Sequence, residues 1–387
     1  MRYIPTTFEK LLEPLNRRQF EAIVERYRGD AYAKTFDSWD HLLTLLHAQL
    51  SGVTSLRGLE TTWNANGEHH YHLGVKKVAR STLSDVNKRR PVAIFLEAFN
   101  LVAKQLSRLA RREAAEICRL IDSTPIPLGK LCEWALSNGR IRGMKMHVVY
   151  DPCSFTPRIL DITHANVNDA EIGRAVPIEA GATYVFDKGY CHYGWWREIA
   201  EKGAFFVTRA KTNMRLRSIG KRPIGQIKGD GFTVLEDAEV RLVSKSSSRL
   251  PMRLRRIKIK RDEGGPLTLL TNDMERSAAD IALLYKGRWQ IELFFRWIKQ
   301  HLELRKFLGK NENAIRLQLV TAMIAYALIR IAATVHRLKI PIHRFLELVI
   351  QCLFERRDIA ALDKPPPVNP SRRRDRTCPN QLSFAYA

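Results

Sequence analysis

The sequence predicts an α/β protein: a helical N-terminal region, a domain of alternating strands and helices with an inserted β-rich subdomain, and C-terminal helices. Apolar residues recur at helical spacing up to about residue 112. Short aliphatic stretches then alternate with helical ones over 113–209, and period-two stretches occur within 210–272. Helical spacing returns over 273–310 and 311–363. We expect domain boundaries at these changes of pattern.

The N-terminal region, residues 1–112, contains one helix start that is clearly marked. Asp37 precedes a long apolar run, as a capping residue does. A later segment, 75–91, carries Ser and Thr residues and ends in Lys88, Arg89 and Arg90. A short helix of this kind could lie against DNA, and a solvated connector between helices fits the pattern equally well.

Two aspartates follow short aliphatic stretches in residues 113–209. Asp122 comes after residues 117–121, where we expect a strand to end, and Asp187 comes after a strand expected over 182–186. A hairpin is expected between them, from strands at 145–150 and 158–163. Carboxylates delivered at strand ends are a common way to build a metal site, although Asp122 could also simply cap a turn.

The inserted segment, 210–272, is predicted to be β-rich and strongly basic. Residues 209–262 hold 16 Lys and Arg against 5 Asp and Glu, a net charge of +11. Among these, Arg253, Arg255 and Arg256 are candidate DNA contacts because they cluster in one period-two stretch.

A helix is expected over residues 285–299, and four polar side chains share one stripe of it. At about 100° per residue, Tyr285, Arg288, Glu292 and Lys299 fall within roughly 60° of one another. Apolar residues fill the neighbouring arc and would anchor the helix to a core. Ordinary surface ion pairing between Arg288 and Glu292 is the alternative explanation.

Composition limits the partner and the compartment. With 64 Lys and Arg against 40 Asp and Glu, the formal net charge of +24 favours a polyanion, most commonly nucleic acid, over an anionic membrane surface. The six cysteines form no C-x-x-C pair, which indicates reduced thiols in the cytoplasm. Residues 317–335 are expected to form a buried helix rather than a membrane span, and 364–387 a flexible basic tail.

The spacing Tyr-x2-Arg-x3-Glu-x6-Lys from Tyr285 to Lys299 resembles the signature of DDE transposases of bacterial insertion sequences, in the insertion-sequence-four family. The resemblance implies a ribonuclease H-like catalytic domain split over 113–209 and 273–310. It implies that Asp122, Asp187 and Glu292 are catalytic and bind metal, with Mg²⁺ expected and Mn²⁺ possible. Tyr285, Arg288 and Lys299 would then bind DNA phosphates.

The expected activity is cut-and-paste transposition, in which the protein cleaves the inverted-repeat ends of its element and joins the 3′ ends to target DNA. Double-stranded DNA, as transposon ends and as target, is the expected partner, and a homodimer would hold two ends together in a synaptic complex. No membrane partner is expected. A nuclease without strand transfer and an inactive DNA-binding protein derived from a transposase remain alternatives.

Overall fold

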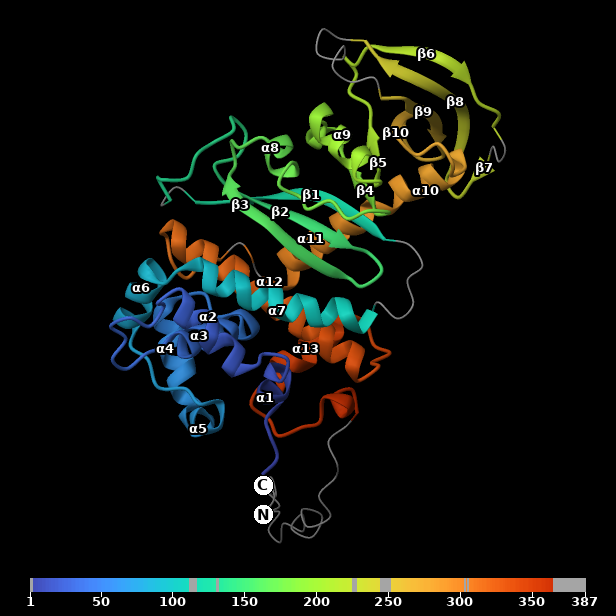
Figure 1. Ribbon diagram of the computed structural model, residues 1–387. Coiled ribbons are helices and arrows are strands. Elements are labelled where there is room, and N and C mark those ends of the chain that lie inside the picture. The colour runs from blue at the N-terminus through green and yellow to red at the C-terminus, as the bar shows by residue number, and fades with distance from the viewer. Residues whose placement is uncertain are drawn as a thin grey trace, which may run out of the picture.

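The computed structural model describes residues 3–110, 117–129, 132–224, 228–243, 252–302, 304 and 306–364. Within these ranges the fold is a single mixed sheet flanked by helices on both faces (Figure 1). The tail expected over 364–387 lies, apart from Lys364, outside the described residues.

The N-terminal region is helical, as its apolar spacing predicted. Asp37 caps α3 in a reciprocal capping box with Asp40, so the predicted helix start is confirmed. The helices in chain order are α1 (Thr7–Leu12), α2 (Arg17–Arg26), α3 (Ser38–Ser51), α4 (Leu56–Ala65), α5 (His70–Leu73), α6 (Arg80–Arg89) and α7 (Val92–Ala110).

The first half of the sheet has the strand order β3-β2-β1-β4-β5. Strands β1 to β3 form an antiparallel meander, whereas β4 and β5 run parallel to β1. Helices α8 and α9 cover one face, and α11 and α12 lie on the other (Figure 1). The bounds are β1 (Cys118–Pro127), β2 (Gly143–Asp151), β3 (Thr156–His164), α8 (Asp169–Gly173), β4 (Thr183–Phe186), α9 (Tyr193–Glu201) and β5 (Phe205–Arg209).

The expected strand end at Asp122 is wrong. Strand β1 continues to Pro127, because its pairing with β2 runs unbroken from Leu120 opposite Tyr150 to Pro127 opposite Gly143. Asp122 therefore lies inside a strand, opposite Val148. Asp187, in contrast, directly follows β4, as predicted.

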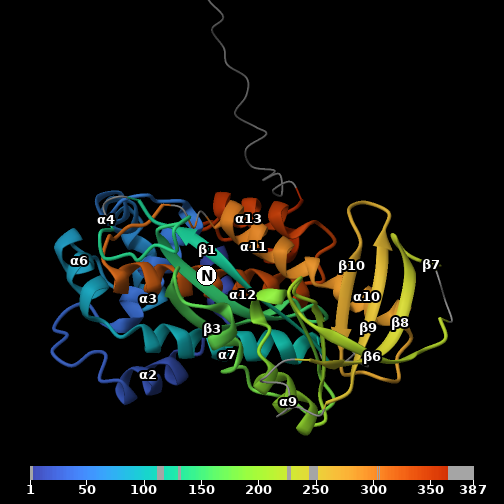
Figure 2. The same ribbon diagram turned by 90° about the horizontal axis from the view of Figure 1, so that it is seen from above.

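The basic segment between β5 and the next helix contributes further strands to the same sheet. Strand β10 pairs with β5, and the order continues β10-β9-β8-β6, which makes ten strands in the described residues once β7, paired with β8, is included (Figure 2). The bounds are β6 (Leu216–Lys221), β7 (Lys228–Gly229), β8 (Phe232–Leu242), β9 (Leu254–Arg261) and β10 (Leu267–Thr271).

The helix expected over 285–299 is not continuous. It consists of α10 (Ala278–Gly287) and α11 (Trp289–His301), separated by a turn at Arg288. The Arg288 backbone N–H donates to Tyr285 O at 3.1 Å, which is a tighter, three-residue turn than the α-helix makes. Ser277 caps α10 by accepting from the Asp280 N–H.

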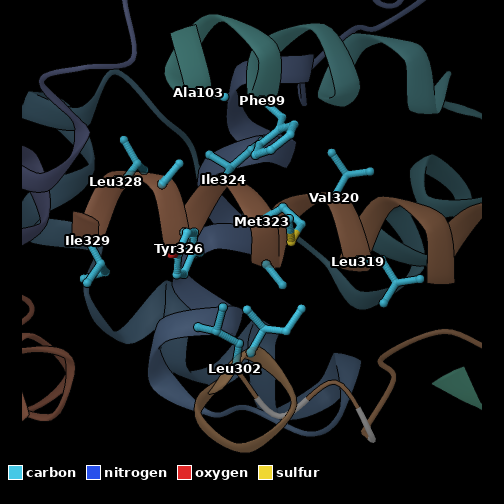
Figure 3. Packing of buried hydrophobic residues seen from close by; sticks show 14 of the residues in the cluster. Phe99, Ala103, Leu302, Leu319, Val320, Met323, Ile324, Tyr326, Leu328 and Ile329 are labelled. Carbon is cyan, nitrogen blue, oxygen red and sulfur yellow. The ribbon is translucent and has the colours of Figure 1, made fainter. Parts of the chain in front are cut away.

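Helix α12 (Glu312–Val335) is the centre of the larger core, and α13 (Ile342–Gln351) packs beside it. Phe99 and Ala103 of α7 lie against one side of α12, and Leu302 lies against another (Figure 3). Helix α12 is long and apolar enough to cross a membrane by length and composition, yet 78% of its most apolar window is buried inside the protein. The prediction of a buried helix over 317–335 is therefore confirmed.

Candidate active site

Asp122 and Asp187 are brought side by side by the sheet. Ile121 and Phe186 are register partners on the parallel strands β1 and β4, and each aspartate is the next residue along the chain. Adjacent strands lie about 4.8 Å apart, so both carboxylates emerge at the same point of the sheet. Helix α11 packs against β1 and brings Glu292 to this point.

Asp122 is largely buried, and both of its oxygens accept hydrogen bonds. Oδ1 accepts from the Ser123 N–H at 2.9 Å, and Oδ2 accepts from Arg288 Nη1 at 3.2 Å. Burial raises the pKa of Asp122 from 3.8 to about 6. Arg288 and the Ser123 amide oppose that rise, while the nearby Glu292 and Asp187 add to it.

Arg288 joins Asp122 to Glu292. Its Nη2 donates to Glu292 Oε1 at 2.6 Å, so a single guanidinium spans two carboxylates, one on β1 and one on α11. Its side chain is only 16% exposed. Burial is the largest single effect on the pKa of Arg288 and lowers it. Tyr285, Asp122 and Glu292 together outweigh burial, so the pKa is raised.

Tyr285 joins the same helices to Asp187. Its hydroxyl donates to Asp187 Oδ1 at 3.1 Å, and its ring centroid lies 5.7 Å from Arg288 Cζ. Burial, and then the charge of Asp187, raise the pKa of Tyr285 to about 12, so the hydroxyl keeps its proton at neutral pH. Five of the residues singled out from the sequence thus form one connected polar network.

The carboxylates suit a hard divalent cation, since Mg²⁺ and Mn²⁺ prefer oxygen ligands. Among the described residues, however, no group of three His, Cys, Asp or Glu side chains is close enough to hold a metal ion. Two of the three carboxylates converge on the Arg288 guanidinium instead. Asp122, Asp187 and Glu292 therefore supply the oxygen donors that such a cation prefers, but the Arg288 guanidinium pairs with two of them and they do not form a metal site as they stand.

Lys299 lies further along the same helix. It is seven residues beyond Glu292 on α11, which is about two helical turns, or roughly 10 Å. It follows the same side of the helix as Glu292, as the predicted stripe required, and its side chain is half-buried.

The arginines singled out in the inserted segment occupy three different environments. Arg253 is exposed just before β9. Arg255 is only 2% exposed, and its Nε donates to Asp237 Oδ1 at 2.8 Å, so the expectation that it contacts DNA is wrong for this fold. Arg256 is half-buried and donates to Glu236 Oε1 through Nε at 3.0 Å.

A polar group behind the aspartates was missed from the sequence. Asp169, at the start of α8, accepts from Ser123 Oγ at 3.1 Å and from Lys145 Nζ at 2.9 Å. Since the Ser123 amide also holds Asp122, this group fixes the strand on which Asp122 stands. The residue types carried no signal, because contacts between 123, 145 and 169 exist only once the sheet has formed.

A basic groove was also missed as a whole, although Lys88 had been noted. A hollow of about 700 Å³ lies between the start of α4, helix α6 and the loop before α12. A neighbouring hollow of about 490 Å³ shares Ser84, Leu308 and Lys310 with it and adds Lys88 and Trp134. Four exposed basic side chains line the two hollows and make no ion pair within the described part of the chain: Arg57, Arg80, Lys88 and Lys310.

Comparison with known proteins agrees with this arrangement. Residues 113–328 match the family described as the transposase DDE domain, and residues 4–76 match a domain of unknown function. A protein of Sinorhizobium fredii named as a transposase is 67% identical over 304 residues, covering 79% of this chain and 85% of the relative.

Two further relatives are named as transposases of insertion sequence elements. One, from Geobacillus stearothermophilus, is 31% identical over 261 residues, 66% of this chain and 68% of the relative. The other, from Synechocystis, is 27% identical over 289 residues, 72% of this chain and 76% of the relative. The family match covers more than half of the chain and includes Asp122, Asp187 and Glu292. The chain is therefore a member of the DDE transposase family of insertion sequences.

Proposed function

We propose that this transposase works by cut-and-paste: it binds the inverted-repeat ends of its insertion sequence, cleaves them and joins the 3′ ends to target DNA. The observation that carries the proposal is the convergence of Asp122, Asp187 and Glu292 through Arg288 and Tyr285. Three carboxylates with two phosphate-binding groups beside them are what phosphoryl transfer between DNA strands requires.

Asp122, Asp187 and Glu292 would hold Mg²⁺, with Mn²⁺ as a substitute. The bound metal supplies activation of the attacking hydroxyl and stabilisation of the leaving oxygen. Arg288 and Tyr285 orient the phosphate beside the carboxylates, and Lys299 holds the strand two turns further along α11.

The strand order β3-β2-β1-β4-β5, with an antiparallel meander followed by two parallel strands, supports a ribonuclease H-like catalytic domain. We assign this domain to 113–209 and 273–310. Residues 1–112 would form the DNA-binding domain, 210–272 the inserted subdomain, 311–363 the supporting helices and 364–387 a basic tail.

Duplex DNA would follow exposed basic side chains rather than the buried Arg255. The groove with Arg57, Arg80, Lys88 and Lys310 opens beside the loop that follows α11, so one duplex could pass from it along α11 to the carboxylates. Exposed Arg253 would add a contact from the inserted subdomain. Two ends must be held together for transposition, and a homodimer would provide the second site.

The test is a strand-transfer assay on DNA that carries the inverted repeats flanking the gene, incubated with a target plasmid in a buffer that imitates the bacterial cytoplasm. We expect both cleavage and joining in Mg²⁺, and neither with Asp122→Asn, Asp187→Asn or Glu292→Gln. Cleavage without joining would indicate the nuclease alternative. Binding of the ends without cleavage by the unmodified protein would indicate an inactive DNA-binding protein.

A further inference from the structure

Two signature residues, Arg288 and Tyr285, are expected to bind phosphate. In the structure they form hydrogen bonds with the carboxylates that are expected to bind metal. Arg288 donates to Asp122 at 3.2 Å and to Glu292 at 2.6 Å, and Tyr285 donates to Asp187 at 3.1 Å. Each of the three candidate metal ligands thus accepts a hydrogen bond from a residue at or near the turn between α10 and α11. Arg288 forms this turn, and Tyr285 lies three positions before it. Neither residue can serve DNA and the carboxylates with the same donors at once.

The guanidinium and a metal ion compete for one place. Arg288 spans Asp122 and Glu292, which is where a cation shared by these two carboxylates would sit. An arginine side chain does not lose its proton in proteins, so it cannot become neutral to make room. Two cations at ion-pair distance repel each other, and the guanidinium must therefore leave before the metal enters.

A DNA phosphate offers Arg288 a place to go. A guanidinium binds phosphate in the same bidentate manner in which it binds carboxylates. Tyr285, whose ring lies beside the guanidinium, carries a protonated hydroxyl that can donate to a phosphate oxygen as it does to Asp187. Both residues can thus exchange a hydrogen bond to a carboxylate for one to a DNA phosphate by a movement of the side chain alone.

We infer that Arg288 and Tyr285 form a latch that holds the three carboxylates closed against metal until DNA phosphate draws the two side chains away. The inference rests on the proposed function of these carboxylates. It makes DNA and metal bind cooperatively, and linkage requires that each raises the affinity of the other by the same factor. The DNA-free transposase therefore carries little metal.

The experiment measures Mn²⁺ binding to the full-length, DNA-free protein by electron paramagnetic resonance of the free ion. Arg288→Gln should bind Mn²⁺ more tightly than the unmodified protein, by a factor in the range of about 5 to 150 that is typical of coupled sites. Tyr285→Phe, which releases only Asp187, should show a smaller gain in affinity.

Arg296→Gln is the matched control. Arg296 stands on the same helix, is exposed and contacts Trp289, with its Cζ 5.6 Å from the ring centroid, so its removal changes the net charge equally. Its gain in Mn²⁺ affinity should be much smaller. Equal gains for Arg288→Gln and Arg296→Gln would overturn the latch, as would a loss of affinity in Arg288→Gln.

Two further arms separate the latch from the proposed function. Sulfate, as an anion that Arg288 can bind, should tighten Mn²⁺ binding by the unmodified protein and not by Arg288→Gln; no effect on either would count against the latch alone. Adding Asp122→Asn to Arg288→Gln should cancel the gain in affinity. If the gain survives, Mn²⁺ binds elsewhere, and both the latch and the proposed metal site are wrong.

Should Arg288→Gln prove too unstable to measure, Arg288→Lys gives the same test. An ammonium is a single point of charge and cannot span two carboxylates as the guanidinium does. Arg288→Lys keeps the net charge and should still bind Mn²⁺ more tightly than the unmodified protein. Unchanged affinity in Arg288→Lys would contradict the latch.

Discussion

Replacing Asp122 by asparagine should stabilise the metal-free protein at neutral pH while it abolishes cleavage. The physical reason is the raised pKa of Asp122, about 6 in the folded protein against 3.8 ordinarily. Ionisation of this carboxyl is therefore less favourable in the fold than in the unfolded chain. An amide of the same shape removes the ionisation and with it the cost.

The magnitude follows from a shift of about two pKa units, each worth about 1.36 kcal/mol, which gives roughly 3 kcal/mol. The sign follows from the raised direction of the shift. The contribution of Asp122 to stability is fully present below pH 3.8 and is lost as the pH rises through about 6. The Asp122→Asn variant also loses one of the two hydrogen bonds that the carboxylate accepts, at about 1 kcal/mol, but that loss does not depend on pH.

The assay is thermal unfolding of both proteins between pH 4 and pH 8 in the presence of a chelator. The melting temperature of Asp122→Asn, relative to the unmodified protein, should rise across this range by about 4 °C, for an unfolding entropy of about 2.1 cal/mol/K per residue. Asp262→Asn, in an exposed turn, is the control and should show no such trend. A difference that stays constant with pH would refute the reasoning.

Three more predictions follow from the contacts. Arg255→Leu should lower the free energy of unfolding by about 3–5 kcal/mol, because it removes the buried guanidinium that donates to Asp237 and leaves that buried carboxylate, among the described residues, only Arg222, 4.0 Å away. Arg253→Leu should change the free energy of unfolding little, and equal effects in denaturant titrations would contradict the burial argument. Asp169→Asn should weaken the hold on Ser123 and raise the Mg²⁺ concentration needed for half-maximal cleavage without preventing end binding, and an unchanged requirement would speak against it. Neutralising four basic groove residues together should reduce the slope of log affinity against log salt by up to about 3.6, and a slope that does not change would exclude the groove from the DNA path; these residues are Arg57, Arg80, Lys88 and Lys310.

The features that could be predicted from the sequence depend on local pattern. The cap at Asp37 and the buried helix over 317–335 follow from residues close together in the chain, and the structure confirms both. The position of Asp187 after a strand belongs to the same class. The spacing of Tyr285, Arg288 and Glu292 was sufficient to bring them together, because one helical region carries all three.

The features that could not be predicted depend on distant partners. Strand β1 runs past Asp122 because β2, whose paired residues begin at Gly143, continues to bond with it. Arg255 is buried and Arg253 is exposed, although both belong to one basic stretch, because Asp237 comes within hydrogen-bond distance of Arg255 only after β8 and β9 pair. The turn at Arg288 likewise follows Gly287, a poor helix former, and the prediction of one continuous helix from apolar spacing took no account of it.

The pairing of β10 with β5 has a practical consequence for building chimeric transposases. Main-chain hydrogen bonds join the basic segment to the rest of the sheet. Removing the segment between β5 and β10 would therefore leave β5 as an unpaired edge strand, which promotes aggregation. A chimera should instead retain β9 and β10 of this protein and take only the outer strands β6 to β8 from another transposase. Because the segment continues the sheet, the strand pairing sets the distance between its outermost side chains and the three carboxylates.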